Sequence, residues 1–314
     1  MSPLVIGYAL LALIVIVALW PWLLERFRTP MNELARGNAP GELVELSQGN
    51  THYQWHGPRA ERIIVLVHGL STPSWVFSGL INGLLGMRYR VLTYDLYGRG
   101  YSDRVRGKQS LEFHTQQLSE LLDAVGITVP VTLLGYSMGG AIASKLAADE
   151  PDRIERLILI APAGLAYNPS RLLAFARKNR LLGRWLWGVL GRRQLMNGAR
   201  SDAKSAVAIP DLVTRMRAEL RRRAYLRAIL SSERHTLSQS LQPVHSEISA
   251  MYIPTLAIWG RDDAVIPIQS VGQLAAWNRK ARQEVVEGAG HGLTYTHPEE
   301  VLAVIRDFLR EVPD

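Results

Sequence analysis

The chain has 314 residues, no cysteine and a formal net charge of +8. The lack of cysteine excludes disulfide bonds, thiolate metal sites and cysteine nucleophiles. Hydrophobic residues make up 47% of the chain, which is enough for one large α/β domain with an insertion and is not typical of disorder.

The first segment predicts a membrane anchor. Residues 3–24 form a run of 22 residues without a charge, and as a helix they would span roughly 33 Å, about the hydrocarbon thickness of a bilayer. Trp20 and Trp22 lie at one end, where indole rings favour the interface. A cleaved signal peptide is the alternative, and the missing basic n-region and Ala-x-Ala-like site argue against it.

The charges beside this run predict its orientation. Arg26, Arg28 and Arg36 follow the run, and only the α-amino group precedes it. Under the positive-inside rule this small bias favours a single-pass protein whose catalytic body lies on the cytoplasmic face. Residues 25–41 would link the anchor to the body.

The chain then alternates between predicted strands and helices. Residues 41–57 predict a hairpin, because E-L-V-E-L alternates and Q-G-N forms a turn. Continuous apolar, β-branched runs predict buried strands at residues 62–70, 89–95, 131–136, 156–162, 255–260 and 283–288. Helices are expected at residues 110–125, 138–150 and 298–309. This order is typical of a mostly parallel, doubly wound α/β sheet.

One segment interrupts the alternation. Residues 164–250 have helical periodicity and no clear strand, which predicts a helical cap inserted between two parts of the core, residues 42–163 and 251–314. From Leu165 to Ala250 there are 16 Lys and Arg against 5 Asp and Glu. Anionic membranes and nucleic acids both attract such a segment, but without a recognition motif we expect no nucleic-acid partner.

Three residues predict nucleophilic catalysis. Ser137, in G-Y-S-M-G, lies between a predicted strand and a predicted helix, where the flanking glycines permit a sharp turn that exposes Oγ. A serine hydroxyl needs a base that is itself oriented by an acid. His291 in G-A-G-H-G and Asp263 in G-R-D-D-A-V-I-P each follow a predicted strand, with Asp262 as the rival acid. The order Ser, Asp, His is that of the α/β-hydrolase triad.

These motifs, with H-G-L at 68–70 and D-L-Y-G-R-G-Y-S-D at 95–103, resemble those of an α/β-hydrolase of the serine esterase and lipase type. The apolar N-terminal run, the triad and the helical cap together are similar to membrane-anchored monoacylglycerol lipases. The resemblance implies that Ser137 attacks an acyl carbon with His291 as general base. It also implies that Asp263, three residues after the glycine, holds the imidazole.

The resemblance further implies an oxyanion hole formed by the backbone N–H groups of Leu70 and Met138. His68 would brace the oxyanion loop, and Asp95 would shape the loop after its strand. The sequence has no dinucleotide fingerprint, Walker loop or metal-ligand cluster, so no cofactor and no metal are expected. The remaining histidines singled out in the chain are expected to be ordinary side chains: His52, His56, His235 and His245.

The expected substrate is a lipophilic carboxylic ester. Arginines interleave with Leu and Trp over residues 177–193, and such a helix can lie on a membrane with its apolar face down. A cap that covers the active site and turns its charges to water fits equally well, and the two are compatible. The alternatives on the same residues are a thioesterase, a C–C bond hydrolase and a cofactor-free haloperoxidase. A membrane-tethered binding protein without turnover is the alternative from another class.

Overall fold

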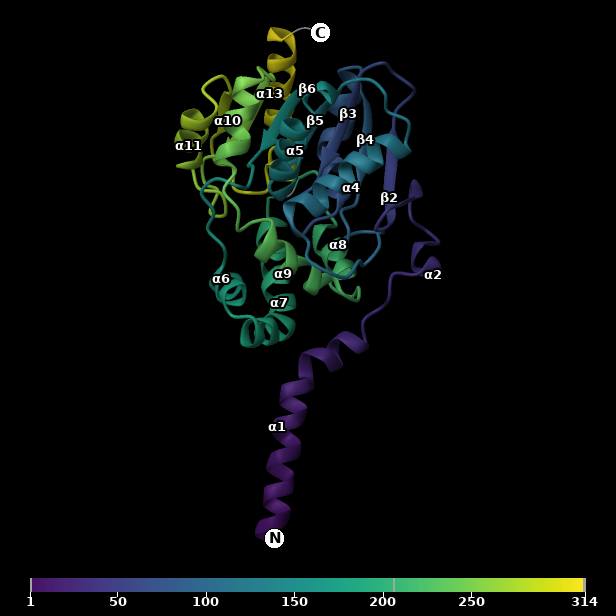
Figure 1. The fold of residues 1–314 in the computed structure, drawn as a ribbon, viewed down its shortest axis with the longest axis vertical. Coiled ribbons are helices and arrows are strands. Elements are labelled where there is room, and N and C mark those ends of the chain that lie inside the picture. Colours follow the sequence, from purple (N-terminus) through teal and green to yellow (C-terminus); the bar gives the residue numbers. More distant parts are fainter. Residues whose placement is uncertain (1, 206, 313–314) are drawn as a thin grey trace.

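The fold is built on one eight-stranded sheet in the order β1-β2-β4-β3-β5-β6-β7-β8 (Figure 1). The computed structural model describes residues 2–205 and 207–312. An antiparallel hairpin forms one edge, and the other strands are parallel. The strands are β1 (Glu42–Leu46), β2 (Gly49–His56), β3 (Ile63–Val67), β4 (Arg90–Tyr94), β5 (Val131–Tyr136), β6 (Ile154–Ile160), β7 (Thr255–Gly260) and β8 (Arg282–Val286). The predicted mostly parallel α/β sheet is confirmed.

Helices cover both faces of the sheet. One face carries α4 (Leu111–Ala124), α5 (Met138–Asp149), α10 (Gln242–Ala250) and α11 (Ser270–Trp277). The other carries α3 (Ser78–Gly86), α12 (Leu293–Thr296) and α13 (Pro298–Glu311). In β3, Val65 and Val67 pack into the first layer, and Ile64 and Leu66 into the second. Side chains of a strand alternate between its faces, which is why a strand buried on both sides has a continuous apolar sequence.

Helices α3 and α11 were not predicted from the sequence. The α3 segment S-G-L-I-N-G-L-L-G contains three glycines, which lower helix propensity. Packing requires two of them: a Cβ on Gly83 would lie 2.3 Å from Leu302 Cδ1, and one on Gly79 would lie 2.6 Å from Ala208 Cβ. Tertiary contacts therefore form this helix despite its weak local preference.

The insertion is helical, as predicted. Helices α6 (Arg171–Lys178), α7 (Leu181–Asp202), α8 (Leu212–Glu219) and α9 (Tyr225–His235) share an apolar cluster of their own. Helix α10, which the sequence analysis grouped with the cap, packs against α5 and α11 on the sheet. Helical periodicity alone does not reveal which layer a helix joins. We therefore propose that the cap ends before Gln242 instead of at residue 250.

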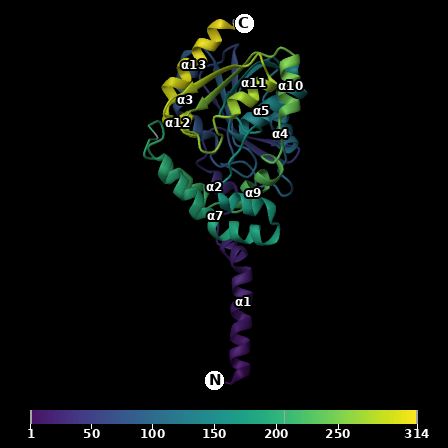
Figure 2. The same ribbon diagram turned by 90° about the vertical axis from the view of Figure 1, so that its left-hand side faces the viewer.

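The N-terminal helix α1 (Pro3–Arg26) leaves the body of the protein. It is long and apolar enough to cross a membrane, and none of its residues is buried. Figures 1 and 2 show α1 projecting from the cap side of the molecule, so that the cap lies between α1 and the sheet. A short helix α2 (Glu33–Arg36) follows before β1.

Candidate active site

Ser137 occupies a strained turn between β5 and α5. Its φ of 55° and ψ of −120° lie in a region that residues with a Cβ rarely adopt. Two backbone bonds hold the turn: Ser137 N–H donates to the Ile160 carbonyl, and Ala163 N–H donates to the Ser137 carbonyl, both at 2.9 Å. A Cβ on Gly139 would lie 1.9 Å from the Val67 carbonyl oxygen. Gly139, two residues after Ser137, is thus a steric requirement of the turn.

The structure brings the three predicted residues together at one end of the sheet. His291 Nε2 lies 3.0 Å from Ser137 Oγ, and His291 Nδ1 lies 2.8 Å from Asp263 Oδ2. The other carboxylate oxygen of Asp263 accepts the N–H groups of Val265 and Ile266 at 2.7 and 2.9 Å. The side chain of Asp263 is buried, whereas Asp262 is exposed.

This arrangement fixes the proton positions. A carboxylate only accepts hydrogen bonds, so His291 Nδ1 carries the hydrogen that points to Asp263. The lone pair of Nε2 is then directed at Ser137, whose hydroxyl donates to it. The neutral imidazole can take up the serine proton.

Two residues orient the main chain beside Ser137. His68 is fully buried, and its Nε2 accepts the Leu96 N–H at 2.9 Å, so Nδ1–H donates to the Gly69 carbonyl at 2.9 Å. Burial lowers the pKa of His68 to about 4, which keeps the ring neutral near pH 7. In a trans peptide the C=O and the following N–H point in opposite directions. With the Gly69 carbonyl turned to His68, the Leu70 N–H points away from it.

The next carbonyl of this loop is fixed by Arg99. Its Nε donates to the Leu70 carbonyl at 3.0 Å, and one terminal nitrogen donates to Ser232 Oγ of α9 at 2.9 Å. Arg99 is buried, and burial lowers its pKa to about 9, so it remains charged near pH 7. Arg99 belongs to the D-L-Y-G-R-G-Y-S-D motif at residues 95–103. Through its bond to Ser232, Arg99 also joins this loop to the cap. The sequence does not predict this bond, because the two residues lie far apart in the chain.

Two backbone N–H groups are available near Ser137. Among the residues that the structure describes, the N–H groups of Leu70 and Met138 donate to no other residue. Met138 begins α5, so its N–H lies at the positive end of the helix dipole. A Cβ on Gly69 would lie 3.1 Å from Ser137 Cβ, which shows how closely this loop approaches the serine.

Tyr136, the residue before Ser137, contributes a contact to this site. Its hydroxyl donates to the His291 carbonyl at 2.9 Å, and the two rings lie 5.4 Å apart. Burial raises the pKa of Tyr136 well above its usual value, so the phenol stays protonated. Tyr136 therefore fixes the backbone of His291 from the residue that precedes the serine.

His52 has its partners away from this site. His52 Nδ1 lies 2.8 Å from Asp95 Oδ2, and the same carboxylate accepts the Tyr101 N–H and the Ser74 N–H. Asp95 thus holds together the loop after β4, the role that the sequence suggested for it. Within the described residues no group of three or more His, Cys, Asp and Glu could hold a metal ion.

Comparisons with known proteins identify the family of the chain. The α/β hydrolase fold family matches residues 62–298. A 2-hydroxy-6-oxononadienedioate/2-hydroxy-6-oxononatrienedioate hydrolase of Paraburkholderia xenovorans (strain LB400) is 30% identical over 282 residues, covering 85% of this chain and 94% of the relative. Monoacylglycerol lipase abhd6-B of Xenopus laevis is 24% identical over 263 residues, covering 78% of this chain and 74% of the relative.

The fold extends over the whole length of one solved structure. The crystal structure of a membrane phospholipase A, described as a bacterial virulence factor, superposes with a TM-score of 0.69 at 21% sequence identity and covers 99% of each chain. At this identity the likeness concerns the fold alone. Together with the match over residues 62–298, it leads to one conclusion: the chain belongs to the α/β hydrolase fold family.

Proposed function

We propose that this protein is a serine esterase that hydrolyses carboxylic esters of lipophilic acyl groups. The observation that carries the proposal is the chain of hydrogen bonds from Asp263 through His291 to Ser137. In it Ser137 is the nucleophile, His291 the general base and Asp263 the residue that orients the imidazole. The N–H groups of Leu70 and Met138 form the oxyanion hole.

The reaction runs through an acyl-enzyme. Ser137 Oγ attacks the acyl carbon while its proton moves to His291 Nε2, and the Leu70 and Met138 N–H groups stabilise the negative oxygen of the tetrahedral intermediate. The intermediate collapses, and the alcohol leaves with the proton from His291. Water then loses a proton to His291 and attacks the acyl-serine, releasing the carboxylic acid and restoring the serine.

The surroundings of the site favour an apolar acyl group. Leu70 packs both on the core and on the apolar cluster of the cap. The cap also lies on the side of the body from which α1 projects (Figure 1). We propose that α1 is a single-pass membrane anchor with the body on the cytoplasmic face, so that substrate reaches the cap from the bilayer.

A second candidate is hydrolysis of a C–C bond, and the Paraburkholderia relative favours it. The compound in that relative's name carries two carboxylates and no ester, so its hydrolysis must break a carbon–carbon bond. Such a dianion calls for cationic side chains around the acyl site. The apolar contacts of Leu70 with the cap favour the ester instead.

A fluorophosphonate probe and a panel of substrates test the proposal. The membrane fraction of the wild type should label, and Ser137→Ala should not. Asp263→Asn should lower kcat by about 10⁴, whereas Asp262→Asn should leave it near the wild-type value. Equal labelling of Ser137→Ala would contradict the assignment of the nucleophile.

The panel combines glyceryl and p-nitrophenyl esters of increasing chain length with a 2-hydroxy-6-oxo-dienedioate. We expect kcat/KM to rise with acyl length, because each buried CH₂ contributes about 0.8 kcal/mol. Preference for acetate esters would exclude the lipophilic substrate. Preference for the dienedioate would support the second candidate.

A further inference from the structure

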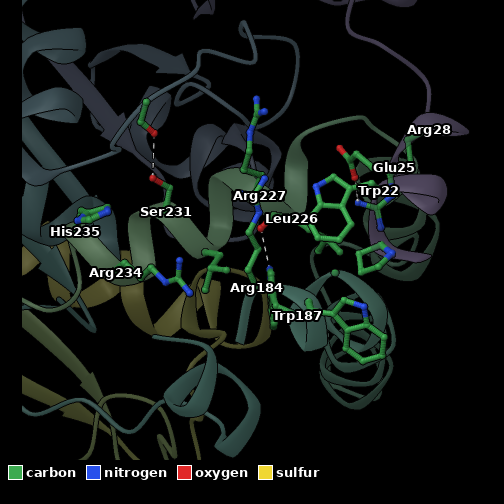
Figure 3. Close-up of a pocket in the computed structure, with 15 residues that line it drawn as sticks. Trp22, Glu25, Arg28, Arg184, Trp187, Leu226, Arg227, Ser231, Arg234 and His235 are labelled. Carbon is green, nitrogen blue, oxygen red and sulfur yellow. Dashed lines mark hydrogen bonds and ion pairs between the residues drawn. The ribbon is translucent and has the colours of Figure 1, made fainter. Parts of the chain in front are cut away.

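A cavity of about 310 Å³ lies between the end of α1 and the cap (Figure 3). Its walls come from the last turns of α1, from α7 and from α9. None of the described residues that line it belongs to the Ser137 site. The cavity is thus a feature separate from the proposed catalysis.

The packing of α1 on α7 forms one wall. Pro21 has no N–H, so the carbonyl of Val17, four residues earlier in the helix, lacks its usual donor. The indole N–H of Trp185 donates to this carbonyl at 2.9 Å. Gly188 permits the close approach, because a Cβ there would lie 2.7 Å from Pro21 Cβ.

A second set of bonds holds the chain after α1 against the cap. The Thr29 N–H donates to the Arg221 carbonyl at 3.0 Å, and the Arg223 N–H donates to the Thr29 carbonyl at 2.8 Å. The Glu25 carboxylate accepts the Ala224 N–H. Both walls of the cavity are therefore fixed by specific contacts.

The lining carries more positive than negative charge. Four arginines and one glutamate face it: Arg28, Arg184, Arg227, Arg234 and Glu25. Glu25 forms an ion pair with Arg28 at 2.7 Å, and Arg234 donates to carbonyls at the end of α6. Arg184 and Arg227 form no hydrogen bond or ion pair with any other residue that the structure describes.

Arg227 lies near one negative and two positive side chains. Partial burial lowers the pKa of Arg227, Glu25 opposes this effect, and the like charges of Arg106 and Arg184 add to it. An anion between Arg184 and Arg227 would offset this repulsion with charge-assisted hydrogen bonds.

Most of the remaining lining is apolar or aromatic, with Pro21, Trp22, Trp185, Trp187, Leu226 and Leu230, and its other members are Gly107, Gly188, Ser231 and His235. The Arg184 guanidinium lies 6.0 Å from the centre of the Trp22 ring. Trp20 and Trp22 end the apolar run of α1, where tryptophan marks the level of lipid headgroups. An anion at this depth would be part of a lipid.

We propose that this cavity binds the phosphate of an anionic phospholipid, with Arg184 and Arg227 as its ligands. Trp22 and Trp185 contact the glycerol and the first carbons of the acyl chains. The bound lipid joins α1 to the cap and holds the cap against the bilayer. The inference rests on the proposed membrane span of α1 and is independent of the proposed ester hydrolysis.

The test measures lipid selectivity in the full chain carrying Ser137→Ala, so that no lipid can be consumed by the proposed reaction. The protein is inserted into phosphatidylcholine vesicles that contain brominated phosphatidylglycerol or brominated phosphatidylcholine, and quenching of tryptophan fluorescence is recorded. Phosphatidylglycerol should quench preferentially. The double variant Arg184→Gln/Arg227→Gln should lose about tenfold or more in relative affinity for it.

The matched control removes two arginines from exposed positions of α7 outside the cavity, Arg193→Gln/Arg200→Gln, and should keep the preference. Equal losses in both double variants would show general surface attraction and overturn the proposal. Displacement of the lipid by millimolar inorganic phosphate would indicate a site for soluble anions and would also overturn it.

Vesicle flotation and probe labelling separate this inference from the proposed function. Failure of the wild type to float would contradict the membrane span and, with it, the lipid site. Failure of the wild type to react with fluorophosphonate would contradict the proposed esterase activity alone. Selectivity of the Ser137→Ala variant for phosphatidylglycerol would still support the lipid site.

Discussion

The peptide between Gly69 and Leu70 shows how single residues prepare this site. His68 binds its carbonyl, and Arg99 binds the following one. The H-G-L motif placed His68 near the oxyanion loop, because its neighbours are consecutive in sequence. The sequence could not reveal that Arg99 reaches Ser232, which is more than a hundred residues away. Contacts within a motif were thus predictable, and those between core and cap were not.

A buried histidine on the far side of α5 makes the stability of the fold depend on pH. His245 stacks on Trp277 with the ring centres 6.3 Å apart, and neither of its nitrogens has a hydrogen-bond partner among the described residues. Burial lowers its pKa to about 4. Between pH 6.5 and 4 the unfolded chain therefore binds a proton that the folded protein does not bind, and stability falls as pH falls.

The variant His245→Phe should remove this dependence. It keeps an aromatic ring against Trp277 and leaves no unpaired nitrogen. Its free energy of unfolding should exceed that of the wild type by an amount that grows by up to about 3 kcal/mol from pH 7 to pH 4. Urea denaturation at several pH values measures the difference. A difference that stays constant with pH would contradict the prediction. His68 is present in both proteins, so its contribution to the pH dependence cancels in the difference between their free energies of unfolding.

At the scale of elements, strands were predictable because each apolar run is buried on both faces, as in β3 and β6. The helices whose presence or position was not predicted are those that depend on their neighbours in the fold. Helix α3 forms because α13 packs on its glycines, and α10 joins the sheet because α5 offers it an apolar face. Neither partner can be read from the local pattern.

The contact between α1 and α7 can be tested directly, since the chain has no cysteine. A Cβ on Gly188 would lie 2.7 Å from Pro21 Cβ, and the usual Cβ separation in a disulfide is about 3.8 Å, so the two helices need to move apart by only about 1 Å for the bond to form. The variant Pro21→Cys/Gly188→Cys should form a disulfide on mild oxidation in membranes. Non-reducing electrophoresis and intact mass detect it.

The control for this pair is Gly7→Cys/Gly188→Cys. Gly7 lies fourteen residues before Pro21 in α1 and has no other residue within reach of a Cβ, so it would be about 21 Å away along the helix. It should not cross-link. Equal oxidation of both pairs, or of neither, would show that α1 does not rest on α7.

In the whole molecule, helix α1, the cap and the sheet follow one another along one axis (Figures 1 and 2). The chain after α1 binds the turn before α9, and Tyr225 at the start of α9 donates to the Ser71 carbonyl beside the oxyanion loop. A chain of contacts therefore connects the end of α1 with the loop that contains Leu70. The effect of an N-terminal deletion should therefore depend on whether it removes the residues that contact the turn before α9.

Two N-terminal deletions should behave differently. Removing residues 2–19 takes away exposed residues of α1 and leaves Glu25 and Thr29 in place. The product should stay in the soluble fraction and label with fluorophosphonate at the wild-type rate. Removing residues 2–31 also removes the bonds to the turn before Tyr225, and at about 1 kcal/mol each their loss should loosen the cap.

The longer deletion should therefore melt at a lower temperature than the shorter one and label more slowly. The two soluble proteins are compared with each other, which avoids any effect of detergent. The shorter deletion keeps residues 20–31, which make two backbone bonds through Thr29, accept the Ala224 N–H on Glu25 and accept the Arg223 side chain on the Arg26 carbonyl, and which include no catalytic group. A difference in labelling rate between the two forms therefore reports the connection between the cap and the loop of Leu70. Identical rates and melting temperatures would show that the segment after α1 serves only as a tether.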